Sequence, residues 1–275
     1  MLGLGNFMYR VATVLEGLYV NAFSVTTDGT DDFIRVEGNA SNEALWPNAS
    51  GADRGWSQSL WVKCQESLKL MSTTPENKGS IKMEFRFNGN LKVQFIGNRT
   101  NGINQALNLN AEVVPANNTV SDWRHIVVTF NLADANSSIV CYVDGTEFSV
   151  AAGNATYSSA GTWAAVSGLW NHTQGIGEDQ GDTLTYSYGG GSFSLLQGLD
   201  EISIYDEVLD QTQVNSLYNS GTPVSVEGVS DYLLGWWKMG DGDTHPTLSD
   251  SSGNGYDMSM NNMESADIQE DVPPS

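Results

Sequence analysis

The chain has 275 residues, of which 10% are aromatic, with 29 glycines, two cysteines and a formal net charge of −21. This length allows one large core, and many aromatic residues beside Gly, Asn, Ser and Thr are typical of numerous strands joined by turns. The charge disfavours nucleic acid as a partner because it would repel phosphates, and no apolar stretch approaches the length of a membrane span.

The negative charge is concentrated in the second half of the chain. Residues 1–124 hold 12 acidic and 11 basic residues, whereas residues 125–275 hold 21 acidic residues and a single basic one, Lys238. The simpler interpretation is a solvated acidic surface that resists aggregation. The alternative is that the acids bind divalent cations or dock onto a basic partner.

Residues 1–21 form a predicted N-terminal arm with a partly helical apolar stripe. Such an arm must be covered, either by its own domain or by a neighbouring subunit. Arg10 and Glu16 interrupt the apolar run, and no basic segment precedes it, so the pattern does not predict a secretory signal. We therefore expect synthesis in a cytoplasm.

Alternation of apolar and polar residues predicts most of the strands. The predicted strand regions are 22–36 (two strands around Asp28-Gly29-Thr30), 55–64, 80–96, 123–130 and 138–150. Asn88-Gly89 and Asp144-Gly145 are typical two-residue hairpin turns, since both positions accept positive φ. One apolar and one polar face per strand favour an antiparallel sandwich.

Residues 153–192 differ from the rest because they combine a Gly189–Gly191 run with several aromatic residues. We expect one strand near 162–168 and a long loop, and long loops often carry function. The two cysteines, Cys64 and Cys141, fall within predicted strands. Either a disulfide or two buried thiols fits this pattern.

Residues 198–221 read as one strand followed by one short helix. In the strand, Ile202 and Ile204 face one way, and their polar neighbours face the other. The helix is predicted to begin with a capping box of Asp210 and Gln213, to bury one apolar stripe and to end at Gly221 in a left-handed C′ conformation. The stripe and the preceding staple involve Leu209, Val214, Leu217 and Tyr218.

Four stretches in register carry a family resemblance. They are FSVTTDGTDDFIRV (23–36), GWSQSLWVKC (55–64), DWRHIVVTFN…SSIVCYVDGTEFSV (122–150) and GLDEISIYDEVLDQTQVNSLYNSG (198–221). Together they resemble laminin-G-like domains of the concanavalin A-like lectin/glucanase superfamily. The resemblance implies an all-β, two-sheet antiparallel jelly-roll sandwich over residues 22–221, with a short helix at 211–219. Residues 222–275 would then be a C-terminal extension.

The C-terminal extension has motifs of its own. YLLGWWKMGDG and DSSGNG resemble the segment that commonly opens a laminin-G-like repeat, although here they follow the domain. The extension also resembles C-terminal segments of laminin-G-like proteins encoded by marine bacteriophages.

The resemblance implies a structural calcium ion held between the opening turn and an acid on the closing strand. The matching positions are Asp28, Gly29, Asp31 and Asp32, with Asp200 as the expected side-chain ligand from the closing strand. These oxygen donors suit Ca²⁺. The alternative is that Asp28 and Asp31 only satisfy N–H groups of the turn.

A second acidic group comprises Asp241, Asp243 and Asp250. Its spacing does not match an EF-hand loop, and solvated turn residues explain it more simply.

Hydrolase relatives of this fold use two carboxylates on one strand as nucleophile and general acid. Glu201 and Glu207 approach that motif most closely, but Ser203 replaces its central Asp. The three histidines lack zinc spacing, and neither a nucleophile triad nor a nucleotide-binding fingerprint is visible. We therefore predict that the protein is not an enzyme.

Sugars stack on aromatic faces, so Trp170, Tyr186 and Tyr188 are candidate glycan-binding residues. Trp163 alternates with Ala and Val and is expected in the core.

Taken together, these features predict a non-enzymatic phage virion protein, made in the host cytoplasm and displayed as a capsid decoration or a tail/fibre component. Its expected partners are other virion proteins, further copies of itself in a homo-oligomer, and cell-surface glycans. The alternative is an extracellular carbohydrate-binding or adhesin module exported by a bacterium.

Overall fold

We describe the fold from a computed structural model of the chain. It describes residues 19–28, 30–36, 45, 55–64, 69–73, 78–85, 90–98, 104–112, 120–130, 139–148, 155–157, 184–186 and 196–274.

Sheet A runs in the order β10-β9-β8-β3-β13-β1-β17, and β14 also pairs with β13. Its strands are β1 (Ser24–Val25), β3 (Trp56–Cys64), β8 (Arg124–Phe130), β9 (Ile139–Val143), β10 (Thr146–Phe148), β13 (Leu196–Tyr205), β14 (Leu233–Trp237) and β17 (Ile268–Gln269). The longest strand, β13, has β3 on one side and both β1 and β14 on the other.

Sheet B runs in the order β11-β7-β6-β5-β4-β12-β2-β16-β15. Its strands are β2 (Phe33–Val36), β4 (Lys69–Thr73), β5 (Lys78–Phe85), β6 (Asn90–Asn98), β7 (Asn104–Glu112), β11 (Ala155–Tyr157), β12 (Leu184–Tyr186), β15 (Thr247–Leu248) and β16 (Met258–Asn261). Each described pairing is antiparallel, which confirms the predicted sandwich.

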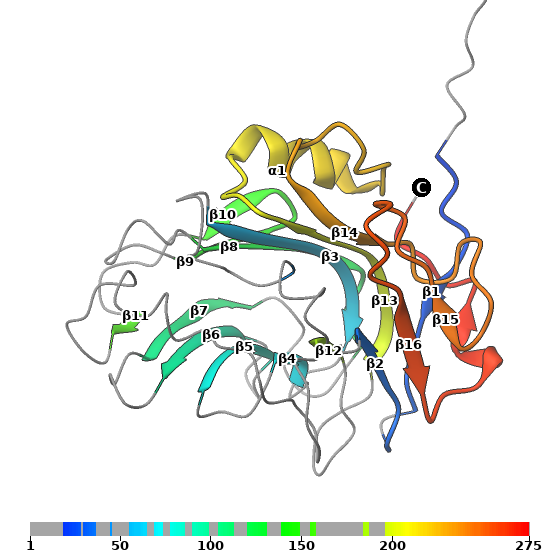
Figure 1. Cartoon of the computed structure of the whole chain (residues 1–275). Helices are drawn as coiled ribbons and strands as arrows, with labels where there is room; N and C mark the ends of the chain where they lie inside the picture. Colours follow the sequence, from blue (N-terminus) through cyan, green and yellow to red (C-terminus); the bar gives the residue numbers. More distant parts are fainter. Residues whose placement is uncertain are drawn as a thin grey trace, which may run out of the picture.

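Three layers result, with helix α1 (Gln211–Tyr218) covering the outer face of sheet A (Figure 1). Ile202 and Ile204 of β13 belong to the main core cluster, whereas Tyr205 packs in a second cluster with Val214 and Leu217 of α1. The predicted alternation along β13 is therefore confirmed.

The helix begins as predicted and ends differently. Asp210 accepts hydrogen bonds from the N–H groups of Thr212 and Gln213, and the side chain of Gln213 accepts from the N–H of Asp210. The left-handed conformation begins earlier than predicted, at the C-cap Asn219 (φ 43°), which opens the short 3-10 turn η4 (Asn219–Gly221). Gly221 at the end of that turn also has a positive φ, of 102°. Asn is one of the few non-Gly residues that adopt this conformation readily.

The two predicted hairpins also differ in outcome. Asp144 and Gly145 both have positive φ and join β9 to β10 directly, as expected. In the other hairpin Phe85 pairs with Leu91, whereas a two-residue Asn88-Gly89 turn would pair Arg86 with Leu91. The register is therefore that of a longer connection, and residues 86–89 themselves lie outside the described residues.

The opening strands do not form a hairpin. β1 belongs to sheet A and β2 to sheet B, so the turn at residues 26–32 carries the chain from one layer to the other. This places the acidic residues of the turn at the edge of the sandwich.

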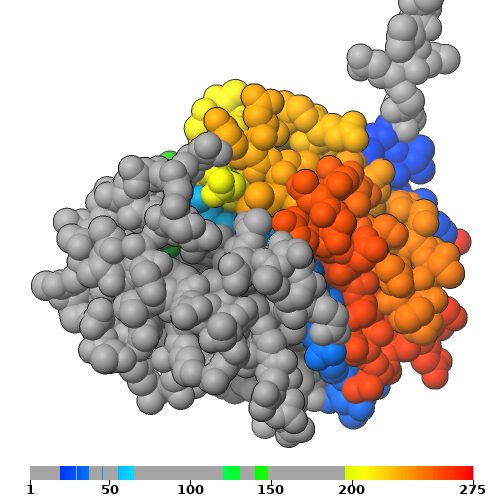
Figure 2. All heavy atoms as spheres, viewed as in Figure 1, coloured from blue at the N-terminus to red at the C-terminus, as the bar shows by residue number. Residues whose placement is uncertain are grey.

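Residues 222–275, expected as an extension beyond the sandwich, supply strands to both sheets. β14 pairs with β13, β16 with β2, and β17 with β1. Figure 2 shows this segment, orange to red, as a continuous part of the surface beside the N-terminal strands. Its core residues are Trp237, Met239, Leu248, Met258, Met260 and Met263. The segment is therefore built into the sandwich.

Cys64 and Cys141 are both free and buried, which decides between the two sequence-based alternatives. Burial raises the pKa of each thiol. No helix in the described part of the chain is long and apolar enough to span a membrane. The strand predicted near 162–168 and the core position expected for Trp163 lie outside the described residues.

Candidate functional site

The turn between β1 and β2 gathers three carboxylates. Ligand atoms of Asp28, Asp31 and Asp32 all lie within 4.8 Å of one another. Asp28 Oδ1 accepts a hydrogen bond from the N–H of Thr30 (2.7 Å), and Asp32 Oδ2 accepts from the N–H of Asp28 (2.8 Å). The turn therefore uses two carboxylate oxygens internally, and Asp28 and Asp31 remain exposed.

The carboxylates of Asp28, Asp31 and Asp32 repel one another. Burial raises the pKa of Asp32, and the charges of Asp28, Asp267 and Asp31 raise it further. A hard cation would offset this repulsion, and carboxylate oxygens are ligands that Ca²⁺ prefers. These residues therefore fit such an ion. Gly29, expected to add a carbonyl oxygen, lies outside the described residues.

Asp200, the expected ligand from the closing strand, lies outside this carboxylate group. It is fully buried in β13, and Asn21 Nδ2 donates to its Oδ2 at 2.9 Å while the N–H of Glu201 donates to its Oδ1 at 2.8 Å. Burial raises the pKa of Asp200 well above the ordinary value. The structure thus brings Asp28, Asp31 and Asp32 together and places Asp200 elsewhere.

Asp200 and Glu201 lie at an irregularity of β13. Asp200 pairs with Trp61 and Ser203 with Ser59, so β13 has one residue more than β3 between these pairs. Glu201 is the extra residue, with a φ of 48°. A bulge of this kind re-aims side chains, and two consecutive acids are buried as a result.

The carboxyl group of Glu201 has one strong partner. Trp236 Nε1 donates to Oε2 at 2.7 Å, whereas Oε1 has no hydrogen-bond partner. Burial raises the pKa of Glu201 to about 8, the charge of Asp241 adds to this, and the Trp236 hydrogen bond and Lys238 act in the opposite direction. Glu201 is therefore mostly neutral at neutral pH.

A layer of N- and C-terminal residues closes over these acids. Tyr19 lies 6.2 Å from Trp236 between ring centroids, and Lys238 Nζ lies 4.5 Å from the Trp236 ring centroid and 5.8 Å from that of Tyr19. The N–H of Ala22 donates to both carboxylate oxygens of Asp241, at 3.2 and 3.1 Å. The chain just before β1 is thus held by carboxylates.

This geometry bears directly on hydrolysis. A carboxylate acting on a glycosidic bond must contact the sugar, but Glu201 is only 3% exposed and Ser203 is fully buried. Glu207 Oε1 accepts a hydrogen bond from Gln213 Nε2 at 2.8 Å, which ties it to α1. Glu201 and Glu207 therefore do not face a common substrate.

The acids of the second group accept hydrogen bonds from backbone N–H groups. Asp250 accepts from the N–H groups of Trp236, Ser252 and Tyr256. Asp243 accepts from the N–H groups of Gly240 and Ser249. These contacts agree with the interpretation of Asp243 and Asp250 as turn residues, whereas Asp241 binds the distant N–H of Ala22 instead.

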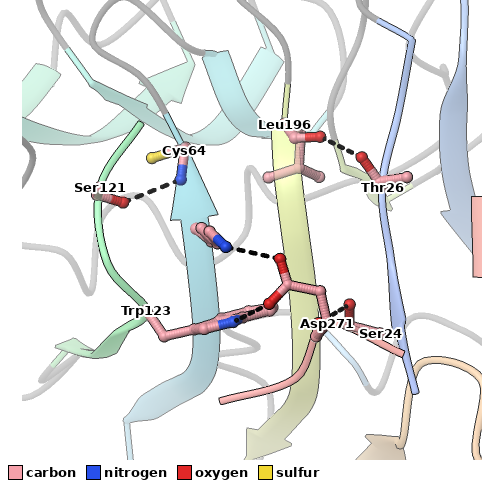
Figure 3. A network of polar contacts seen from close by, with 8 residues as sticks. Ser24, Thr26, Cys64, Ser121, Trp123, Leu196 and Asp271 are labelled. Atoms are coloured by element: carbon pink, nitrogen blue, oxygen red, sulfur yellow. Dashed lines mark hydrogen bonds and ion pairs between the residues drawn. The ribbon is translucent and has the colours of Figure 1, made fainter. Parts of the chain in front are cut away.

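Figure 3 shows a further polar network, which links the end of the C-terminal segment to β1, to β3 and to Trp123 just before β8. Asp271 accepts from Lys63 Nζ (2.6 Å) and from Trp123 Nε1 (3.2 Å), and its carbonyl oxygen accepts from Ser24 Oγ (2.6 Å). The Trp123 ring meets β13 where Gly198 has no side chain; a Cβ there would lie 2.4 Å from the ring. The sequence pattern gave no sign of this network.

The histidines have structural surroundings where they are described. His125 is buried beside Trp61 and Tyr218, and its Nε2 lies 2.8 Å from Ser59 Oγ. Burial lowers its pKa to about 3, so it stays neutral, as the expected packing role requires. His245 Nε2 lies 2.9 Å from the carbonyl oxygen of Met263, and His172 lies outside the described residues.

The structure describes little of the candidate glycan-binding residues. Tyr186 lies in β12, where its backbone is paired with Ile34 and Met71. Its side chain lies outside the described part, as do Trp170 and Tyr188.

Sequence reasoning missed the layer around Glu201. Asn21, Trp236, Lys238 and Asp241 come from the two predicted appendages, which the structure joins over β13. One signal was present: Lys238 is the only basic residue after Arg124, and an isolated cation in an acidic region marks a place where charges must be balanced.

Comparison with protein families places this fold. Residues 37–215 match a laminin-G-like family model described as the concanavalin A-like lectin/glucanases superfamily. The chain belongs to this superfamily. Its two-sheet architecture, with one short α-helix among the described residues, is that of the lectin-like jelly roll, and the matched region includes β13 and the start of α1. No curated protein sequence is significantly similar to the chain.

Among solved structures of the lectin-like fold, a Bacteroides ovatus ATCC 8483 protein proposed to bind carbohydrate has a TM-score of 0.52 at 13% identity, covering 94% of this chain and 62% of that chain. The receptor-binding domain of botulinum neurotoxin mosaic serotype C/D has a TM-score of 0.47 at 15% identity, covering 74% and 42%. A pentraxin from Limulus polyphemus has a TM-score of 0.37 at 15% identity, covering 72% and 80%. This chain thus spans less than two thirds of the first two.

Proposed function

We propose that this member of the lectin/glucanases superfamily is a non-enzymatic glycan-binding module displayed on a phage virion, as a capsid decoration or a tail/fibre component. The observation that carries the non-enzymatic part is the burial of Glu201 under Trp236. The closing strand then serves as scaffold, and binding falls to loops at the ends of the sandwich.

The virion assignment is supported by the resemblance of residues 222–275 to C-terminal segments of marine-phage laminin-G-like proteins. The acidic second half also suits a surface that must stay dispersed in salt water. Display in many copies would let a weak sugar site act through avidity.

The test combines location with binding. Virion mass spectrometry should find the protein in many copies, and a glycan array probed with the full-length protein should give signals that Tyr188→Ala reduces at least about tenfold. Tyr232→Ala is the matched control, because Tyr232 is an exposed tyrosine (40%) of the C-terminal segment. Glycan binding without virion association would favour the exported bacterial module. Turnover of a β-glucan that Glu201→Gln abolishes would contradict the non-enzymatic assignment.

We also propose that Asp28, Asp31 and Asp32 hold a structural calcium ion. If 1 mM Ca²⁺ exceeds Kd about tenfold, binding stabilises the fold by about 1.4 kcal/mol, which is a rise in Tm of about 3–6 °C for a chain of this size. Asp31→Asn is expected to remove most of this rise, because Asp31 is exposed and leaves the turn's hydrogen bonds intact. Scanning calorimetry with and without Ca²⁺ measures both values.

Two controls sharpen the calcium test. Asp231→Asn removes an exposed acid elsewhere and should keep the full rise. Asp200→Asn should also keep it, since Asp200 lies outside the carboxylate group. A calcium response unchanged in Asp31→Asn would show that the carboxylates only satisfy the turn.

A further inference from the structure

β14 pairs with β13 along one edge, and the loop that joins β15 to β16 covers the other. In this loop the N–H of Ser251 donates to the carbonyl oxygen of Trp236 at 2.6 Å. The side chain of Asn254 adds two more contacts, because its Nδ2 donates to the carbonyl oxygens of Leu233 at 3.3 Å and of Leu234 at 2.9 Å. Asn254 therefore takes the place of part of a neighbouring strand.

Gly255 follows Asn254 at the exposed tip of the loop. Gly255 has a φ of 81°, and a Cβ built on it would meet no atom within 4 Å. Its N–H makes no hydrogen bond within the described part of the chain. The two hydrogen bonds of Asn254 Nδ2 lie at the surface, where water replaces a lost bond at small net cost. The side chain of Asn254 can therefore turn toward the backbone nitrogen of Gly255, which has no side chain to hinder the approach.

We propose that Asn254 is a site of spontaneous deamidation, and that its modification loosens the loop from β14. The backbone nitrogen of Gly255 loses its proton to hydroxide and attacks Cγ of Asn254. The new bond from nitrogen to Cγ closes a five-membered succinimide, the bond from Cγ to Nδ2 breaks, and ammonia leaves with a proton taken from water. One water molecule then opens the ring at either carbonyl carbon, which gives aspartate or isoaspartate. This inference does not rest on the glycan-binding proposal.

The modification reverses the role of the side chain at position 254. An ionised carboxyl group only accepts hydrogen bonds, so it would face the carbonyl oxygens of Leu233 and Leu234 without a donor. The added charge also repels Asp250 and Asp257, two acids of the same loop that already accept backbone hydrogen bonds. Isoaspartate further lengthens the backbone by one methylene group. Each of these changes favours withdrawal of the loop from β14.

Incubation of the full-length protein at pH 8 and 37 °C, followed by peptide mass spectrometry, tests the modification. Asn254 should progressively lose its amide, and an isoaspartyl methyltransferase should label the product, since the cyclic route gives isoaspartate and direct hydrolysis does not. Incubation at pH 6 should slow this loss, because hydroxide is scarcer there.

Asn262 is the matched control within the same chain. It is exposed and its Nδ2 donates to the carbonyl oxygen of Asp31 at 3.0 Å, but it precedes Met263, whose side chain hinders attack by the backbone nitrogen. Asn262 should keep its amide while Asn254 loses it. An intact amide at Asn254, equal losses at Asn254 and Asn262, or a product without isoaspartate would overturn the proposal.

Two variants separate the lost hydrogen bonds from the new charge. Asn254→Ala removes two exposed hydrogen bonds and should lower Tm by about 2–4 °C. Asn254→Asp should lower Tm further, because its carboxylate faces the two carbonyl oxygens. In Asn254→Asp the N–H of Ser251 should lose about tenfold of its protection from hydrogen exchange, whereas Thr27, whose N–H donates to Leu196, should keep its protection. A Tm of Asn254→Asp at or above that of Asn254→Ala would contradict the proposed loosening.

Discussion

Deleting residues 222–275 is expected to abolish folding of the remaining chain. The segment fills part of the main core with Trp237, Met239, Leu248 and three methionines, and each buried apolar side chain is worth about 1.5–3 kcal/mol. The sum rivals the about 5–15 kcal/mol by which a whole domain is stable. The truncated chain should lack a cooperative thermal transition and should bind a hydrophobic dye, as measured by calorimetry and ANS fluorescence.

Cleaving the full-length chain, rather than truncating it, tests whether the fold needs the C-terminal segment itself or only its covalent connection. A protease site placed at the exposed Glu227-Gly228 turn should allow cleavage while both pieces stay associated, because β14, β16 and β17 remain paired with β13, β2 and β1. A truncated chain that melts at the wild-type Tm, or nicked pieces that separate without denaturant, would mean that the segment is a dispensable extension.

Local sequence patterns predict most of the individual elements of the fold. The alternation at Ile202 and Ile204, the capping box of Asp210, and the Asp144-Gly145 turn each follow from residues within a few positions of one another. The resemblance supplied the sandwich itself. What these patterns could not supply is pairing at long sequence separation, such as that of β16 with β2, which depends on tertiary contacts.

The candidate sites show the same contrast between local and long-range contacts. Asp28, Asp31 and Asp32 come together because they share one turn. Asp200 was expected beside them, but a one-residue bulge and the Asn21 contact direct it into a different environment. The residues that close over Glu201 bring Asn21 and Ala22 against Asp200 and Asp241, about 180 to 220 positions later in the chain, so neither half of the chain reveals this arrangement alone.

The free energy of unfolding is expected to fall as pH rises from 6.5 to 8. The pKa of Glu201 is raised by burial from 4.5 to about 8, so the folded state binds the extra proton and its stabilisation is lost as pH rises through this window. Below pH 6.5 His125, whose pKa is lowered by burial to about 3, acts in the opposite direction and offsets Glu201. Above pH 6.5 this offset from His125 is gone, and among the described residues Glu201 alone accounts for a decline of about 2 kcal/mol.

Urea unfolding at pH 5.5, 6.5, 7.25 and 8 measures this decline. Glu201→Gln should flatten the curve above pH 6.5, because Gln cannot ionise yet still accepts the hydrogen bond of Trp236 Nε1. The exposed control Glu227→Gln should reproduce the wild-type slope. Asp200, whose pKa burial raises well above its ordinary value, adds to the wild-type decline and sets any slope left in Glu201→Gln. Stability that rises between pH 6.5 and 8 in the wild type would mean that Glu201 is ionised within the fold and that the single cation, Lys238, outweighs its burial.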